Sequence, residues 1–149
     1  RILIGRRDRI LRRWLRKLSP LTTPRIQATA DGARMCLTDL VVRTELVDWE
    51  TRPYWARAWQ HMGGDTLEPI EVGPLARRPP DQICVGLPTV EGATEADPAY
   101  MIVDVQALWS AEDDESRPAR VHLYQLGRGD YRVVGLTRPD GLDAPGPRD

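Results

Sequence analysis

Hydrophobic and polar positions follow two different rhythms along the chain. Over residues 6–18, RRDRILRRWLRKL, apolar side chains recur every three or four positions, which predicts a helix with one apolar stripe. The stripe consists of Ile10, Leu11, Trp14, Leu15 and Leu18. Ser19-Pro20 ends the pattern, because the residue before a proline avoids the α region. The sequence therefore predicts an amphipathic helix and linker over residues 1–20.

From residue 25 onward the pattern is that of β-strands. Short segments rich in β-branched residues are separated by turn signals such as Asp31-Gly32. The longest strand candidate is 99–109, AYMIVDVQALW, which begins a meander with 119–126 and 131–137. Six to eight such strands predict a mostly β domain over 25–139, an antiparallel sandwich or partial barrel. The tail 140–149 is rich in Pro, Gly and Asp and is expected to be flexible.

A second architecture competes with the sandwich. Residues 38–60 include the segments DLVVRTEL and PYWARAWQ, and Trp55 and Trp59 are four apart. That spacing suits one face of a helix and also one face of a strand. If this stretch is helical, the domain is an α+β cone in which helices pack against one curved sheet. The sandwich is favoured, and the conformation of 38–60 decides between them.

Residues 121–136, VHLYQLGRGDYRVVGL, contain Arg128-Gly129-Asp130, which resembles the integrin-binding tripeptide of adhesion proteins. A two-residue turn at Arg128-Gly129 would place Asp130 in the strand ladder opposite Gly127. The resulting register predicts the pairs Leu126–Tyr131, Gln125–Arg132, Tyr124–Val133, Leu123–Val134, His122–Gly135 and Val121–Leu136. Apolar residues then meet apolar residues on both faces. A hairpin turn is therefore favoured, and adhesion stays an alternative.

The distribution of charge adds an asymmetry to this picture. The 149 residues carry 21 basic and 22 acidic side chains, for a net charge of −1. Residues 1–18 hold eight of the basic groups and one acidic group, a charge of +7, which leaves −8 for the remainder. A basic arm before an acidic body predicts an anionic partner for the arm, or docking of the arm on the body.

The basic arm has three interpretations. Its candidate contact residues for an anionic surface are Arg6, Arg9, Arg12, Arg13, Arg16 and Lys17. The favoured interpretation is that the apolar stripe packs on its own domain or on a neighbouring segment. The second is that the helix lies on an anionic membrane surface with Trp14 at the interface. Binding to nucleic-acid phosphates is disfavoured, because the acidic body would repel them.

The chain begins with Arg, so it is expected to be a processed product or a domain of a longer protein. No apolar run approaches about 18 residues, so no transmembrane helix is predicted. The compartment is not determined by the sequence. The basic cluster favours a membrane-proximal location, and a disulfide would favour an extracytoplasmic one.

Cys36 and Cys84 each fall in a strand candidate. As a disulfide they would stabilise the fold by about 2–4 kcal/mol, whereas two buried thiols would imply nothing, and both interpretations stay open. The order Cys36, Trp49, Cys84 resembles the immunoglobulin-type sandwich, in which a buried Trp packs on an inter-sheet disulfide. Gln82 occupies the position where that fold has a tyrosine, so the family is not assigned.

Two aromatic groups are candidate ligand sites. The first consists of Trp49, Tyr54, Trp55 and Trp59. Aromatic faces stack on sugars and on bases, so glycan binding is one interpretation. The favoured one is that these side chains form the core of a domain without Phe. The second group belongs to the cone architecture and would line a small-molecule pocket: Tyr100, Trp109, His122 and Tyr124.

Motifs for catalysis do not occur in the sequence. It lacks GxSxG, HExxH, GxxxxGK and GxGxxG. His61 and His122 are too few for a zinc site, and the run 112–115 lacks the spacing of a calcium loop. No catalytic residue, metal or cofactor is predicted.

The sequence therefore favours a non-catalytic binding or scaffolding module of a larger protein or assembly, with a protein partner. The first alternative is the small-molecule-binding cone, with weak enzymatic use. The second is an adhesion or glycan-binding domain.

Overall fold

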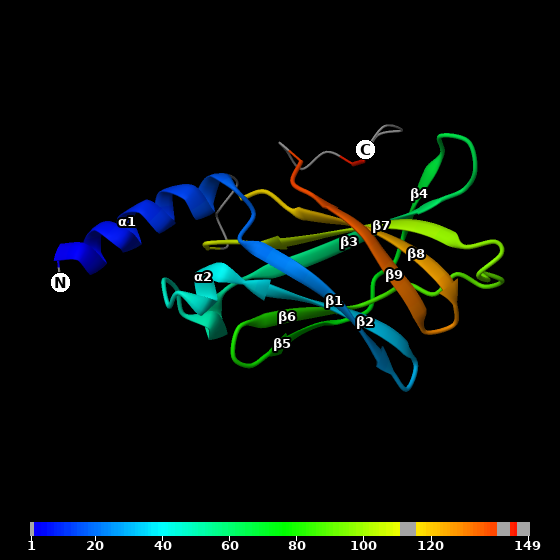
Figure 1. Cartoon of the computed structure of the whole chain (residues 1–149), viewed down its shortest axis with the longest axis horizontal. Helices are drawn as coiled ribbons and strands as arrows, with labels where there is room; N and C mark the ends of the chain where they lie inside the picture. The colour runs from blue at the N-terminus through cyan, green and yellow to red at the C-terminus, as the bar shows by residue number, and fades with distance from the viewer. Residues whose placement is uncertain (1, 111–115, 140–143, 146–149) are drawn as a thin grey trace.

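A computed structural model of the chain describes residues 2–110, 116–139 and 144–145. The side chains of Arg16 and Lys17, the acidic run 112–115 and most of the tail 140–149 lie outside the described residues. The fold is mostly β and has the arrangement of a sandwich, as predicted. Figure 1 shows two sheets packed face to face, with one long helix extending from one end.

Each sheet is antiparallel throughout. In spatial order, the first contains β1 (Leu21–Thr29), β2 (Gly32–Asp39), β6 (Gln82–Gly86) and β5 (Leu75–Arg78). The second contains β4 (Leu67–Ile70), β3 (Tyr54–His61), β7 (Ala99–Ala107), β8 (Ala119–Gly127) and β9 (Asp130–Thr137). The meander predicted near the C-terminus is therefore β7-β8-β9.

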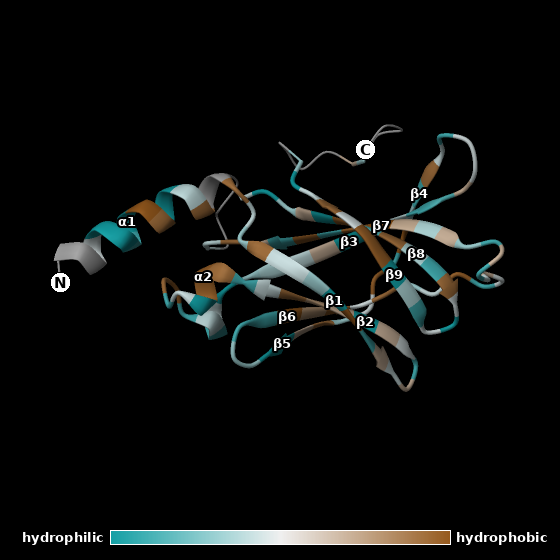
Figure 2. Cartoon of the chain, viewed as in Figure 1, coloured by the Kyte–Doolittle hydropathy of each residue, from teal (hydrophilic) through white to brown (hydrophobic). Residues whose placement is uncertain are grey.

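The core lies between the sheets and is formed by alternate residues of the strands, because successive side chains of a strand point to opposite faces. Figure 2 shows this alternation of hydrophobic and hydrophilic positions along several strands. The first sheet contributes Met35, Leu37, Ile83 and Val85 to the core, and the second contributes Ala58, Met101, Val103, Val105, Val121 and Leu123.

Helices account for little of the region 38–60. It contains the four-residue helix α2 (Leu40–Arg43) and the 3₁₀ turn η1 (Trp49–Thr51), and β3 begins at Tyr54. The α+β cone is therefore wrong, because that architecture requires this stretch to be helical. The N-terminal helix α1 spans Ile2–Lys17, so it begins earlier than the pattern over 6–18 predicts.

The β8–β9 hairpin has the predicted two-residue turn, and Gly127 pairs with Asp130. His122–Gly135 and Val121–Leu136 also pair as predicted. Between the turn and the pair His122–Gly135 the register shifts twice. The observed pairs in this stretch are Gln125–Tyr131, Tyr124–Arg132 and Leu123–Val133. The four pairs predicted over this stretch are wrong. The shifts leave Gln125 and Tyr131 buried and hydrogen-bonded to the segment before β7.

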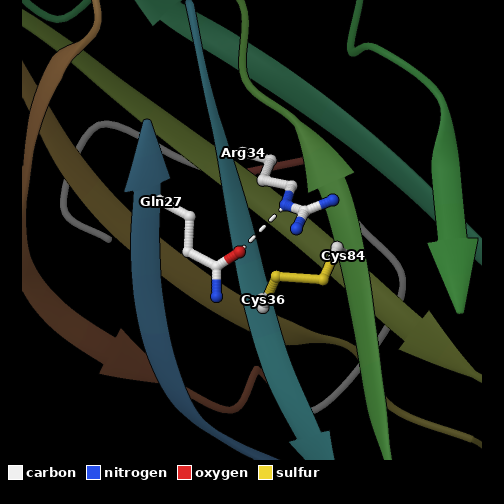
Figure 3. The surroundings of a disulfide bond; sticks show 4 residues. All are labelled: Gln27, Arg34, Cys36 and Cys84. Carbon is white, nitrogen blue, oxygen red and sulfur yellow. Dashed lines mark hydrogen bonds between the residues drawn. A yellow bond between two sulfur atoms is a disulfide. The ribbon is translucent and has the colours of Figure 1, made fainter. Parts of the chain in front are cut away.

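Cys36 and Cys84 form a disulfide. They are directly opposite each other on β2 and β6, which belong to the same sheet. The inter-sheet disulfide that the immunoglobulin-type order implies is therefore not the one formed. Figure 3 shows the disulfide beside Arg34, whose Nε donates to Gln27 Oε1 at 3.0 Å. The disulfide lies on the side of the sheet away from the core, since Met35 and Leu37 point inward.

Gly86 allows close contact between the end of β6 and the segment before β5. Its N–H donates to Pro74 O at 3.2 Å, and its carbonyl accepts from Gly73 N at 2.8 Å. A Cβ added at Gly86 would lie 3.0 Å from Gly73 Cα. A backbone atom cannot move aside as the end of a flexible side chain can.

We therefore expect Gly86→Ala to lower the free energy of unfolding by about 1–3 kcal/mol, the usual range for overpacking. Gly127→Ala is the matched control, because a Cβ there meets no atom within 4 Å. Urea denaturation of both variants measures the difference. Equal stabilities of the two would contradict this account of the contact.

Candidate functional site

The four aromatic residues predicted as one ligand-binding group are divided between two faces of the structure. Trp55 and Trp59 lie on the outer face of β3, whereas Ala58, which lies between them in sequence, points into the core. Tyr54 points to the opposite side of the strand, where its hydroxyl contacts Asp39. Trp49 belongs to η1. The period of two in β3 separates Tyr54 from Trp55, so the set does not form one platform.

Arg57 occupies the space between the two outward-facing indoles. Its Cζ lies 5.1 Å from the Trp55 ring centroid and 4.7 Å from that of Trp59, which is cation–π geometry. Its Nη2 is 3.5 Å from Asp104 Oδ2. The indole faces toward Arg57 are therefore covered by a guanidinium, and Trp59 is only 7 % exposed.

A buried ion pair continues this face of the second sheet. Arg120 Nε lies 2.8 Å from Asp104 Oδ1, and Arg120 Nη2 lies 3.1 Å from Asp104 Oδ2. The two residues are directly paired on β7 and β8. The pair was not predicted from the sequence. The sequence signal was a charged residue within each apolar strand, Asp104 inside β7 and Arg120 near the start of β8, which is rare unless the charge is paired.

Three of the four residues predicted to line a small-molecule pocket come together on the same face. The Tyr100 hydroxyl lies 2.6 Å from His122 Nδ1, and the Tyr100 and Tyr124 rings are 5.3 Å apart. His122 Nε2 lies 3.1 Å from Thr137 Oγ1. Both ring nitrogens are thus used in contacts along the sheet. Trp109 lies elsewhere, with its ring 5.6 Å from Arg52 Cζ.

A second buried charge network joins the two sheets at the end of the sandwich near α1. Asp39 Oδ2 accepts from Arg52 Nε at 2.5 Å and from the Tyr54 hydroxyl at 2.6 Å. Asp39 Oδ1 accepts from Val41 N at 3.0 Å, and Arg52 Nη1 donates to Leu108 O at 2.8 Å. The Asp39 and Arg52 side chains are fully buried. Both carboxylate oxygens of Asp39 therefore have a hydrogen-bond partner within the fold.

The exposed side of α1 is the main apolar surface that the rest of the described chain leaves uncovered. Ile10, Trp14 and Leu18 are four apart and form one stripe, with exposed fractions of 57 %, 58 % and 49 %. Arg6, Arg9 and Arg13 are exposed as well. Leu11 and Leu15 are half-buried, and Arg12 Nη2 donates to Leu46 O at 3.2 Å. The packing of the apolar stripe on the body, favoured from sequence, is therefore not observed for Ile10, Trp14 and Leu18, which stay open to solvent.

An open groove lies at the other end of the sandwich, between the β3–β4 turn and the loop that precedes β7. It encloses about 670 Å³. Its lining includes the rings of His61, Tyr100 and Tyr124 and the carboxylates of Asp65, Glu91 and Asp97. This groove was not predicted from the sequence. The sequence signal was that segments 62–73 and 87–99 contain six acidic residues and no Lys or Arg.

The Arg128-Gly129-Asp130 turn packs beside the β1–β2 turn. Gly129 has a φ of 75°, which favours glycine. A Cβ at Gly129 would lie 3.3 Å from Gly32 O, so the two turns are in contact. Arg128 and Asp130 are exposed. The glycine is thus explained by turn geometry and by the close neighbour.

Comparison with known proteins gives no match to any family model, curated protein or solved structure. Among the described residues, no cluster of three or more His, Cys, Asp or Glu has an arrangement suited to a metal ion. Within that same part of the chain, no helix is both long and apolar enough to cross a membrane. The function has to be inferred from the surfaces themselves.

The Asp39–Arg52–Tyr54 network makes a pH-dependent prediction. Burial, and next the charge of Asp39, raise the pKa of Tyr54 above its ordinary value of 10.0. The unfolded chain therefore loses this proton near pH 10 while the folded chain keeps it, so this contribution to stability is lost as pH rises further. We expect the stability difference between the wild type and Tyr54→Phe to shrink between about pH 9 and pH 12. Urea denaturation across that range measures it, and a constant difference would contradict the network.

Proposed function

We propose that this protein is a non-catalytic binding and scaffolding module, attached to its partner through α1. The observation that carries the proposal is the exposed Ile10–Trp14–Leu18 stripe with arginines beside it. An apolar stripe of this kind is stabilised when a partner removes it from water. Tryptophan and arginine are also the residues that contribute most often to binding energy at interfaces.

The polar groups of the sandwich support a non-catalytic role. Asp39 and Arg52 are buried and pair with each other, and Asp104 pairs with Arg120. His122 bridges Tyr100 and Thr137 within the sheet. Such groups tie strands together, whereas a general base needs to reach a substrate proton. The module therefore contributes surfaces rather than chemistry.

An anionic membrane surface is the second candidate partner of α1. Interfacial helices place an apolar face at the acyl boundary and basic residues near the headgroups. Trp14 lies in the apolar stripe, and Arg6, Arg9 and Arg13 are exposed on α1. This arrangement favours lipid over nucleic acid, because the apolar stripe has no role against phosphates alone.

The attachment role of α1 is tested with Trp14→Glu in the full chain. Two defined partners are offered, a second copy of the chain and vesicles containing phosphatidylglycerol, with sedimentation as the measurement. We expect the wild type to bind at least one of them, and Trp14→Glu to weaken that binding by about tenfold or more. The cause is the loss of a large apolar side chain from the interface.

Val134→Glu is the matched control, because Val134 is also exposed, at 54 %, but lies on β9 away from α1. It should bind as the wild type does. The attachment role is abandoned if the wild type binds neither partner, or if both variants behave alike.

The membrane candidate makes its own prediction about salt. If α1 binds lipid, co-sedimentation with phosphatidylglycerol vesicles should fall several-fold between about 0.05 M and 0.5 M NaCl, since salt screens the arginines. Vesicles of phosphatidylcholine alone are the control and should bind weakly at both concentrations. Equal binding to the two vesicle types would exclude the electrostatic contribution.

A further inference from the structure

The molecule is electrically polarised along its long axis. Figure 1 shows α1 extending from one end, while the β3–β4 turn and the loop before β7 lie at the other end. The described part of α1 presents exposed arginines. At the opposite end six carboxylates are exposed, three in 62–73 and three in 87–99: Asp65, Glu68, Glu71, Glu91, Glu95 and Asp97. We call these two segments the acidic end. The exposed Arg128 lines a hollow together with Glu91, and the six carboxylates still leave this end with an excess of negative charge.

We propose that α1 of one copy docks on the acidic end of a second copy, so that molecules associate head to tail. This inference rests on the proposed function of α1 as an attachment element and names the partner as the same chain. The arginines of α1 would meet the carboxylates of the acidic end. The Ile10–Trp14–Leu18 stripe would meet the rings of the groove.

Both surfaces combine charge with apolar area. The groove is about 670 Å³, and the rings of Tyr100 and Tyr124 in its lining are partly exposed. Met62, in the same β3–β4 turn, is 51 % exposed. Trp14 is 58 % exposed on α1. A tryptophan entering a ring-lined groove with carboxylates around it is the usual composition of an interface centre and rim.

The acidic end cannot be reached by the helix of its own molecule. Arg12 Nη2 donates to Leu46 O, which holds α1 beside the segment between α2 and η1. The eight residues of β3 separate that end from the groove, a span of about 26 Å for an extended strand. The charges of α1 and of the acidic end in one molecule are therefore too far apart to neutralise each other. The exposed carboxylates near α1 in its own molecule are those of the segment that Arg12 contacts, Glu45, Asp48 and Glu50. Contact between α1 and an acidic end requires a second copy.

This geometry determines how the assembly grows. The surface on α1 differs from the surface on the acidic end, so the interface is heterologous. Each added copy presents a free α1 or a free acidic end, and growth continues unless a ring closes. The average mass should therefore rise steadily with protein concentration, whereas a two-fold dimer would reach a plateau.

The first measurement is sedimentation velocity of the wild-type chain as a function of concentration and salt. We expect the average mass to increase with concentration at about 0.05 M NaCl and to return toward the monomer at about 0.5 M, because the charges are then screened. A wild type that stays monomeric at low salt overturns the proposal.

The second measurement uses charge reversal and rescue. One variant carries Arg6→Glu, Arg9→Glu and Arg13→Glu on α1, and the other carries Asp65→Lys, Glu91→Lys and Asp97→Lys on the acidic end. Each alone should stay monomeric, because the reversals lower the charge of residues 1–18 from +7 to +1 in one variant and cancel the charge of the six carboxylates in the other. Mixed in equal amounts, the two should associate again, because the unchanged α1 of one variant meets the unchanged acidic end of the other. A mixture that stays monomeric overturns the proposal.

A third variant controls for net charge. Arg25 and Arg78 are exposed on β1 and β5, away from both docking surfaces. Their replacement by Glu changes the net charge by −4, compared with −6 for the α1 variant. It should associate as the wild type does, and its failure to do so would overturn the docking site on α1. If the wild type is monomeric but binds phosphatidylglycerol vesicles through Trp14, the head-to-tail inference fails and the attachment role of α1 stands. If it binds neither, both fail.

Discussion

The buried contact between Asp39 and Arg52 holds together the end of the sandwich on which everything else depends. Asp39 ends a strand of the first sheet, Arg52 precedes a strand of the second, and Arg52 also donates to Leu108 after β7. Removing one partner of such a pair leaves an uncompensated buried charge, which typically costs about 3–5 kcal/mol. The segment between α2 and η1 lies in sequence between Asp39 and Arg52, and it contains Leu46, whose carbonyl accepts from Arg12 of α1. The position of α1 thus depends on a buried contact at this end of the sandwich.

The opposite end is organised by neutral polar contacts. Gln125 Oε1 accepts from Val90 N at 2.8 Å, and Gln125 Nε2 donates to Val90 O at 3.1 Å. The Tyr131 hydroxyl donates to Pro88 O at 2.6 Å. These contacts hold the start of the loop that carries Glu91. A loop with little regular structure is in this way fixed against the second sheet, and its carboxylates are presented to solvent. The same contacts explain why the hairpin register departs from an ideal ladder.

The sequence was sufficient for the architecture because short β-branched and apolar segments alternate with turn signals along the chain from residue 25 onward. It was not sufficient for the register of β8 and β9. Maximising apolar pairs opposed Leu126 to Tyr131, whereas the structure inserts bulges so that Gln125 and Tyr131 reach the loop before β7. The benefit of those contacts comes from residues far away in sequence. No local pairing rule could include it.

The candidate sites show the same division between local and distant information. Whether Cys36 and Cys84 form a disulfide could not be decided from the sequence, because the answer depends on the pairing of β2 with β6. The prediction of one aromatic ligand-binding group was wrong for a local reason, because the adjacent residues Tyr54 and Trp55 cannot lie on the same face of a strand. The groove is built from three separate segments, around residues 60–65, 90–100 and 124. The acidic character of the groove can be seen in the composition of these segments, but only the fold brings the segments together.

The net charge of −1 hides a separation of basic and acidic groups along this chain. At physiological ionic strength, exposed charges interact little beyond about 8 Å, and the two ends are separated by at least the length of β3. Attraction between them therefore adds little to the stability of the monomer. Repulsion among the like charges gathered at each end remains, and it is a short-range cost within the monomer. A partner that brings the opposite charge would remove that cost, so the charge pattern favours the proposed association more than it favours folding.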